Sequence, residues 1–399
     1  MKVTLKNLSG KSPLLSELRD RGIEVSASCG GRHKCGKCRI IANGEEVLAC
    51  SAYICGDAEV IIPGREEDKK SPYKGNGKKY NLAVDIGTTN VVAAILDGAE
   101  IVDIISAPNA QMSFGADVIN RIQFCREGHL DELKRLICSQ IDSFADYDKI
   151  SVAGNTVMQS IFRGEDPSPV GIPPFEPSGL FENDEVLMPC ISGYVGGDIS
   201  AGLYASGAAR AGGLWLYIDF GTNGEIALGN RNGFITCSCA AGPAFEMSGN
   251  LFGSEVVDET AGLLREGKIG RSGKLKGESV FSQDDIRSIL LAKAAIRAGT
   301  ELLLEASCKA ASDITKLIIA GEFGKYINFE SAKAIGLIPD IEEDKLERAG
   351  NASLKGAILA LDDSKRREIQ SFAKKCGYIE LSSSARFNEL FLKFLVFNN

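Results

Sequence analysis

The sequence predicts a small α+β domain followed by a larger α/β domain that contains two similar halves. Three observations lead to this prediction: a glycine-rich cluster of cysteines near the N-terminus, a charged segment at residues 65–79, and a strand–turn–strand pattern that occurs twice. We therefore expect one domain over residues 1–64, a linker over residues 65–79, and a second domain over residues 80–399. Its halves are expected at about residues 80–212 and 213–399.

The first copy of the repeated pattern occupies residues 80–96, with the sequence YNLAVDIGTTNVVAAIL. An apolar run ends at Asp85, a short polar turn follows, and a second apolar run begins, which is typical of a β-hairpin. The residues of the turn are Gly87, Thr88, Thr89 and Asn90. Backbone N–H groups and hydroxyls in such a turn can bind phosphate oxygens, and the carboxylate can hold a hydrated Mg²⁺ beside them. For a single copy, an ordinary hairpin with a polar turn is the alternative.

The second copy occupies residues 214–229, LWLYIDFGTNGEIALG, and repeats the acid as Asp219. Its turn residues are Gly221, Thr222 and Asn223. Two D-x-G-T turns, one in each half, indicate an internal duplication whose turns can face each other across a cleft. Residues 80–363 resemble the actin-like ATPase superfamily. The resemblance implies a ribonuclease H-like fold in which the first turn holds the β- and γ-phosphates of ATP, the second turn closes over them, and Asp85 and Asp219 orient Mg²⁺ and water.

Three further positions are candidates for the same site. Asp198 follows paired glycines in GYVGGDI at a predicted helix start, where it would either orient the attacking water or serve as the helix N-cap. Gly321 and Gly324 follow a predicted strand over residues 316–320, and the resemblance implies that the backbone here approaches adenine and ribose. Glu322 stands where many relatives have a second glycine, so its side chain could crowd the base.

The N-terminal domain is expected to bind a metal cluster through four cysteines. The four are Cys29, Cys35, Cys38 and Cys50. Their spacing is C-x5-C-x2-C-x11-C, and the first three lie in one glycine-rich loop that can point N–H groups at the sulfur atoms. This pattern favours a 2Fe–2S cluster of the ferredoxin type. Structural zinc, which usually needs two C-x2-C pairs, and unliganded cysteines are the alternatives. Cys55 is expected to be a spare buried thiol.

The elements expected around these cysteines are those of a β-grasp, ferredoxin-like domain. A strand at residues 2–6, a helix at residues 13–21 and strands at residues 40–41 and 58–62 fit that fold. Two features depart from it: the second strand before the helix is missing, and the fourth cysteine follows much sooner than in plant-type ferredoxins. Residues 65–79 are charged and lack apolar periodicity, which is typical of a solvated linker.

The composition predicts a globular, cytoplasmic protein. Of the 399 residues, 44% are hydrophobic and 25% are charged, which provides enough apolar material for a large core. The net charge of −8 argues against nucleic acid or an anionic membrane as a partner. The first residues lack the apolar segment of a secretion signal, no apolar run approaches the length of a transmembrane helix, and twelve cysteines are typical of a reducing interior.

The order of the motifs along the whole chain limits the possible functions. The cysteine loop and the two turns occur together with GNTVM, GIPPFEP, GYVGGDI, CAAGPAFE, AGEFGKYIN and GNASLKGA. This combination resembles the reductive activators of corrinoid enzymes. The resemblance implies that ATP drives an electron from the 2Fe–2S cluster to the Co(II) corrinoid of a methyltransferase corrinoid protein and restores Co(I). It also implies an upstream low-potential electron donor, and a homodimer is one arrangement that we consider.

Two other functions stay open at this point. One is activation of a different low-potential metalloenzyme, and the other is a nucleotide-gated electron carrier that has lost hydrolysis. Family members usually carry an extra domain between the ferredoxin-like and ATPase domains, for which residues 65–79 are too few. Other members carry C-terminal 4Fe–4S sites, whereas Cys376 stands alone here. These departures affect the identity of the partner more than the chemistry.

Overall fold

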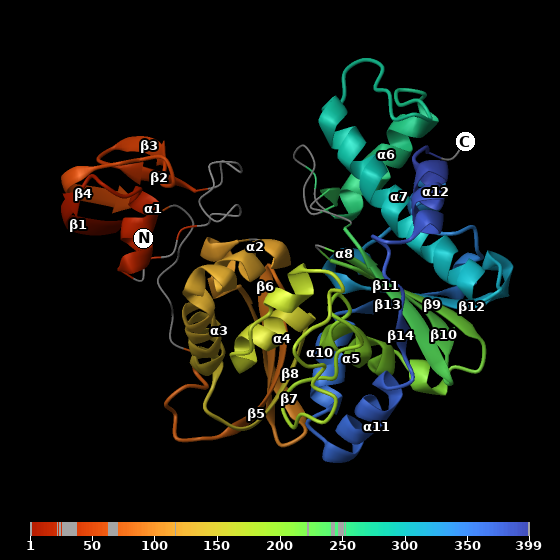
Figure 1. Cartoon of the computed structure of the whole chain (residues 1–399), viewed down its shortest axis with the longest axis horizontal. Coiled ribbons are helices and arrows are strands. Elements are labelled where there is room, and N and C mark those ends of the chain that lie inside the picture. Colours follow the sequence, from red (N-terminus) through yellow and green to blue (C-terminus); the bar gives the residue numbers. More distant parts are fainter. Residues whose placement is uncertain are drawn as a thin grey trace. The chain divides into compact units, whose positions relative to one another are not determined.

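The computed structural model describes residues 2–21, 23, 25, 38–62, 71–115, 117–221, 223–240, 244–245, 251 and 253–397, apart from the side chains of residues 322 and 323. The chain divides into two compact units, which we describe separately (Figure 1). The first unit comprises residues 1–150 and 157–178, and the second comprises residues 151–156 and 179–399. No helix among the described residues is long and apolar enough to cross a membrane.

The N-terminal part of the first unit is a four-stranded antiparallel sheet with one helix. The elements are β1 (Lys2–Ser9), α1 (Leu14–Asp20), β2 (Arg39–Ala42), β3 (Glu45–Leu48) and β4 (Cys55–Ile61). The strand order is β1-β4-β2-β3, and three leucines of α1 pack with strand residues in one buried core. The sequence did not predict β3. It forms a hairpin with β2 through Asn43 and Gly44, whose φ angles of 51° and 89° suit a two-residue hairpin turn.

Residues 71–79, expected to belong to a solvated linker, are tied to the end of α3 (Leu130–Phe144). The backbone N–H of Asp146 donates to the carbonyl of Tyr73, and the Asp146 carboxylate accepts from the N–H of Gly75 at 2.6 Å. Lys74 forms an ion pair with the same carboxylate at 2.8 Å. Residues 71–79 are therefore attached to the larger domain and do not form a free linker.

The first half of the larger domain contains a four-stranded sheet in the order β7-β6-β5-β8. Its strands are β5 (Tyr80–Ile86), β6 (Asn90–Asp97), β7 (Glu100–Pro108) and β8 (Tyr147–Gly154). Between β7 and β8 the chain forms α2 (Val118–Phe124), a π-helical turn (Cys125–His129) and α3. Gly128, with φ 94°, separates the two helices.

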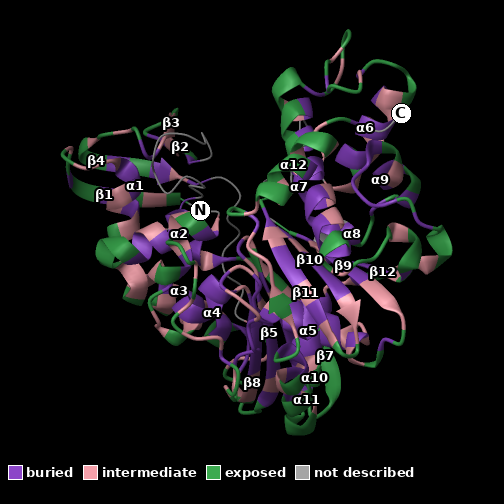
Figure 2. Ribbon diagram, turned by 45° about the vertical axis from the view of Figure 1, so that its right-hand side comes forward, coloured by how far each residue is buried: buried purple, intermediate pink, exposed green. Residues whose placement is uncertain are grey.

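The second half repeats this arrangement. Its sheet has the order β13-β12-β9-β10-β11-β14. The strands are β9 (Leu214–Phe220), β10 (Gly224–Asn230), β11 (Gly233–Cys239), β12 (Ile314–Ala320), β13 (Leu346–Gly350) and β14 (Gly377–Tyr378). As in the first half, the first strand pairs with an antiparallel second strand, the third follows beyond it, and the fourth lies on the other side. The duplication predicted from the two turns is confirmed. The central strands β5, β6, β9, β10 and β12 are largely buried, whereas β7 is not (Figure 2).

Some helices of the larger domain pack closely enough to require glycine. The helices of the larger domain not yet named are α4 (Thr156–Arg163), α5 (Gly197–Ala205), α6 (Ser254–Arg265), α7 (Gln283–Ala306), α8 (Gly321–Gly324), α9 (Phe329–Ile335), α10 (Ala352–Leu359), α11 (Asp363–Ala373) and α12 (Ala385–Phe394). Helices α5 and α10 lie side by side (Figure 1), and a Cβ on Gly356 would overlap the Ala201 carbonyl. A Cβ on Gly202 would overlap the Tyr217 hydroxyl. Helix α5 is thereby packed tightly against both α10 and the Tyr217 side chain of β9.

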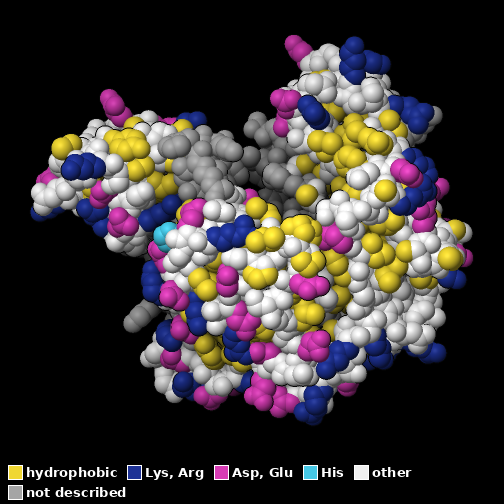
Figure 3. Space-filling view, in the orientation of Figure 1, with side chains coloured by type: hydrophobic (Ala, Val, Ile, Leu, Met, Phe, Trp, Pro, Cys, Tyr) yellow, Lys and Arg dark blue, Asp and Glu magenta, His cyan; other side chains and the backbone are white. Residues whose placement is uncertain are grey.

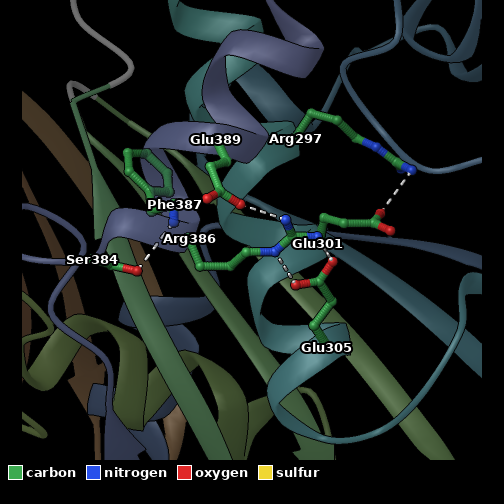
Figure 4. A network of polar contacts seen from close by, with 7 residues as sticks. All are labelled: Arg297, Glu301, Glu305, Ser384, Arg386, Phe387 and Glu389. Carbon is green, nitrogen blue, oxygen red and sulfur yellow. Dashed lines mark hydrogen bonds and ion pairs between the residues drawn. The ribbon is translucent and has the colours of Figure 1, made fainter.

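The C-terminal helix α12 is attached to the long helix α7 by polar contacts. Arg386 donates to both carboxylate oxygens of Glu305, at 2.7 and 2.6 Å, and to Glu389 (Figure 4). The buried Lys293 ammonium on α7 donates to the carbonyls of Phe394 and Val396 at 2.9 and 2.6 Å. These bonds satisfy the carbonyl of Phe394, the last residue of α12, and that of Val396 just beyond it. Carbonyls at the end of a helix have no hydrogen-bond donor within the helix.

Candidate functional site

The first turn joins β5 to β6 and is tight. A Cβ on Gly87 would lie 2.6 Å from the Asn90 carbonyl oxygen, so only glycine fits there. Asp85 lies at the end of β5, and Thr88 is buried in the turn. The predicted strand, acid and turn are therefore in place within the first unit, and Thr89 and Asn90 complete the loop into β6.

The second turn joins β9 to β10 in the second unit. Its closing hydrogen bond runs from the N–H of Gly221 to the carbonyl of Asn223 at 2.9 Å, and Thr222 lies outside the described residues. Asp219 occupies the same place in this hairpin as Asp85 in the first. The Tyr217 hydroxyl donates to Oδ2 of Asp219 at 3.2 Å, which helps to orient the carboxylate.

Asp198 and Asp219 influence a third acid that the sequence reasoning missed. Glu225 lies directly opposite Asp219 in the β9–β10 pairing, and the Ser238 hydroxyl donates to it at 3.2 Å. Burial, and then the carboxylates of Asp198 and Asp219, raise the pKa of Glu225 well above its usual value. A signal was present in the sequence, because an acid six residues after Asp219 must return beside it across a two-strand hairpin.

The helix-cap interpretation of Asp198 is wrong. The N-cap of α5 is Gly196, and Asp198 lies in the first helical turn, where its carboxylate accepts from the N–H of Ile199 at 2.8 Å. Gly196 takes the cap position because a side chain there would lie 2.6 Å from the carbonyl of Gly154 and the N–H of Thr156. The GNTVM and GYVGGDI motifs thus meet at this point.

Among the described residues, no three carboxylates, cysteines or histidines converge as a preformed metal cage would. Asp219, Asp198 and Glu225 interact electrostatically without surrounding one point. Such an arrangement suits Mg²⁺, which keeps several waters and is usually held by one or two carboxylates together with substrate phosphates.

The two candidate glycines after β12 lie against other elements of the second half. Gly321 has φ 85°, and a Cβ there would lie 2.7 Å from Oδ1 of Asp219. A Cβ on Gly324 would lie 2.5 Å from the Ile319 side chain. The described contacts thus place Gly321 beside the acid of the second turn. Contact of either glycine with adenine or ribose stays a prediction, as does crowding by Glu322, whose side chain is not described.

Two of the four predicted cluster ligands lie in the described part of the N-terminal domain. Cys38 and Cys50 are both buried, and the N–H of Ala49 donates to the Cys38 carbonyl at 2.9 Å, which brings their segments together. Cys29 and Cys35 lie outside the described residues. Two buried thiols on segments joined in this way are compatible with the proposed ligation. Cys55, expected to be buried, is instead exposed because it begins β4 at the end of the sheet.

The surface carries no single-sign charge field on the face drawn in Figure 3, where basic and acidic side chains are interspersed.

The duplicated sheets and their paired turns define the class of protein, an actin-like protein of the ASKHA type. Two family models match the larger domain: the C-terminal domain of RACo, the ASKHA domain, at residues 213–261 and 269–399, and the RACo middle region at residues 80–211. The chain belongs to the RACo family, the reductive activators of corrinoid enzymes.

Individual relatives agree with this assignment. The chain is 29% identical to the corrinoid activation enzyme RamQ of Eubacterium limosum, across 85% of this chain and 72% of that protein. It is 21% identical to the [Co(II) methylated amine-specific corrinoid protein] reductase of Methanosarcina barkeri, across 78% and 76%. The solved structure of a reductive activator for corrinoid, iron–sulfur protein is similar with a TM-score of 0.71 and 25% identity, covering 98% of this chain and 96% of that one.

Proposed function

We propose that this protein is an ATP-dependent reductive activator, which transfers an electron from a 2Fe–2S cluster to the Co(II) corrinoid of a methyltransferase corrinoid protein. The observation that carries the ATP-dependent part is the D-x-G-T turn at the same hairpin of both repeated sheets. Membership of the RACo family and the names of the relatives support the corrinoid protein as partner.

Each half contributes one turn to Mg-ATP in this proposal. Asp85 and Asp219 hold the hydrated metal, and Asp198 orients the attacking water. The groups that bind phosphate are Gly87, Thr88, Thr89, Asn90, Gly221, Thr222 and Asn223. Gly321 and Gly324 approach the base and ribose. The raised pKa of Glu225 favours a protonated side chain without a cation, so metal binding next to it favours its ionisation.

The N-terminal domain, over residues 1–64, supplies the electron. Cys29, Cys35, Cys38 and Cys50 would hold a 2Fe–2S cluster, which stores and passes one electron when bound. The electron arrives from a low-potential donor and reduces Co(II) to Co(I), so one electron is lost by the domain and one is gained by cobalt.

An energetic argument supports coupling to ATP. Ferredoxin-type clusters have potentials near about −400 mV, and the Co(II) corrinoid is harder to reduce. Each ~59 mV of uphill potential costs about 1.4 kcal/mol for one electron. A simple relay would therefore leave little Co(I), whereas a nucleotide-driven change that favours the reduced product can raise its yield.

ATP hydrolysis by acid variants tests the assigned nucleotide site. Asp85→Asn and Asp219→Asn should each abolish hydrolysis and leave the absorption of the cluster unchanged. Asp97→Asn is the matched control, because Asp97 is an acid at the opposite end of the same hairpin, where it pairs with Lys78. Hydrolysis at the wild-type rate by the Asp85 or Asp219 variant would contradict the assignment. Wild-type protein without ATPase activity would favour the nucleotide-gated electron carrier.

A further inference from the structure

The carbonyls of Gly87, Thr88 and Thr89 in the first turn accept hydrogen bonds from residues that follow β7 in the chain. The Gly87 carbonyl accepts from the Asn109 side-chain amide at 2.8 Å, and the Thr89 carbonyl accepts from the Asn109 backbone N–H, also at 2.8 Å. Between them, the Thr88 carbonyl accepts from the guanidinium of Arg121 on α2. The turn is therefore held from one side by two residues.

This arrangement determines where the N–H groups of the turn point. In a planar trans peptide the N–H of one residue points opposite to the carbonyl of the preceding residue. Since the carbonyls of Gly87 and Thr88 face Asn109 and Arg121, the N–H groups of Thr88 and Thr89 point to the other side of the turn. Successive N–H groups directed to one side form a site for an anion.

Arg121 is an unusual group to find at this position, because its side chain is fully buried. It also donates to the Gln111 side-chain oxygen and to the Gly115 carbonyl, both at 3.2 Å, and contacts the Met158 sulfur. These partners within the described part of the chain are all neutral. A buried charge whose contacts are neutral is costly unless an anion elsewhere balances it.

The charged and titratable groups near Arg121 do not remove this cost. Burial lowers the pKa of Arg121 to about 9, and the nearby Asp117 carboxylate opposes that shift only in part. The Asp117 carboxylate is engaged with the N–H and side-chain amide of Asn120 at the start of α2. Burial raises the pKa of the Cys125 thiol to about 12, so it is neutral at physiological pH. Arg121 is therefore a charged residue beneath the first turn.

We propose that Arg121 is a positioning residue for polyphosphate: it fixes the Thr88 carbonyl, directs the neighbouring N–H groups at the phosphates, and supplies positive potential from beneath the turn. This inference rests on the proposed nucleotide site. It assigns the balancing anion to the bound nucleotide, and it predicts that the contribution of Arg121 depends on the β- and γ-phosphates and is absent for a ligand that lacks them.

A purely structural role for Arg121 is the competing explanation, and the chain offers a matched control. Arg366 on α11 is also buried, and it donates to one backbone carbonyl, that of Ala360, at 3.0 and 2.8 Å. Arg366→Gln thus removes a buried, hydrogen-bonded guanidinium that is remote in sequence from either turn.

The experiment measures dissociation constants for Mg-ATP and for AMP by calorimetry on the full-length wild type, Arg121→Gln, Arg121→Lys and Arg366→Gln. Arg121→Gln should weaken ATP binding on the order of tenfold or more and change AMP binding little, because a charge-assisted bond and the buried charge are both lost. Arg121→Lys keeps the charge but loses the planar guanidinium with its fixed set of donors. This variant should weaken ATP binding about threefold relative to AMP binding. Arg366→Gln should leave the ATP-to-AMP ratio at the wild-type value.

If Arg121→Gln keeps the wild-type ratio of the dissociation constants for ATP and AMP, the proposal is overturned, whatever the melting temperature of the variant. If Arg121→Gln does not fold, Arg121→Lys decides, and an unchanged ratio in that variant would overturn the proposal as well. Failure of the wild type to bind ATP is a different result, because it would reject the nucleotide site itself.

Discussion

Oδ1 of Asp219 lies 2.7 Å from the position that a Cβ atom would take on Gly321. The acid that ends β9 and the residue that follows β12 are therefore in contact, although about a hundred positions separate them in the chain. The parallel pairing of these two strands brings their ends to the same edge of the sheet. Asp219 can keep its orientation only while residue 321 has no side chain.

Gly321→Ala should consequently impair Mg-ATP binding as well as folding. The new methyl group would displace the Asp219 carboxylate and overlap the Phe220 carbonyl, and it would strain a backbone with φ 85°. We expect ATP hydrolysis to fall at least tenfold in protein that is still folded by circular dichroism. Gly207→Ala is the control, because Gly207 has φ 88° and its nearest heavy atom would lie 3.8 Å away. It should cost on the order of 1–3 kcal/mol of stability and leave hydrolysis intact.

The raised pKa of Glu225 predicts a pH-dependent stability difference. Above about pH 4.5 the unfolded chain releases this proton while the folded protein keeps it, so the group destabilises the folded state increasingly as pH rises toward its folded pKa. Glu225→Gln should therefore raise the melting temperature of metal-free protein at pH 7, and the difference should shrink as pH falls toward 4.5. Equal melting temperatures across this range would show that Glu225 is not held in its neutral form.

The cysteines of the N-terminal domain should differ in their effect on the cluster. Anaerobically purified protein is expected to be brown, with the absorption and the reduced-state paramagnetic signal of one 2Fe–2S cluster. Cys38→Ser and Cys50→Ser should remove that signal, whereas Cys55→Ser should retain it, because Cys55 is exposed at the start of β4. Metal analysis that gives about one zinc and no iron would contradict the cluster assignment.

The duplication could be predicted from the sequence because Asp85 and Asp219 lie in turns whose flanking strands have the same apolar pattern. The contacts around those turns could not. Asn109 and Arg121 belong to a loop and a helix with no signature of their own, and only the three-dimensional path of the chain brings them beneath Thr88. From the sequence, Arg121 would be expected on the exposed face of α2, because an arginine is rarely buried unless its charge is paired.

Local sequence patterns also gave wrong predictions for single residues and short segments. Asp198 after two glycines fits a helix cap, but the close approach of Gly196 to Gly154 gives the cap position to the glycine. The polar residues 71–79 fit a linker, but Asp146 binds their backbone. Both differences arise from tertiary contacts, which a pattern in one segment does not contain.

Cutting the connection between the modules should slow electron transfer without damaging either part. A protease site placed between residues 65 and 70 avoids the stretch held by Asp146. A tether of this length supplies an effective concentration on the order of millimolar, so cleavage should lower the rate of cobalt reduction by a large factor at micromolar protein. The rate should recover as the concentration of the two pieces rises. A rate that does not respond to cleavage would show that the tether has no role in the transfer.

The role of ATP is tested most directly by the Co(I) absorption band of a corrinoid protein that starts as Co(II). The intact chain, a reductant of fixed potential and Mg-ATP are supplied, and the same reaction is run without ATP. We expect Co(I) to accumulate with ATP and to stay near the baseline without it. We also expect the baseline from residues 1–64 alone, which lack the ATPase, and from residues 71–399 alone, which lack the cluster and keep the stretch held by Asp146. Equal Co(I) yields with and without ATP would contradict the central claim that nucleotide drives the reduction.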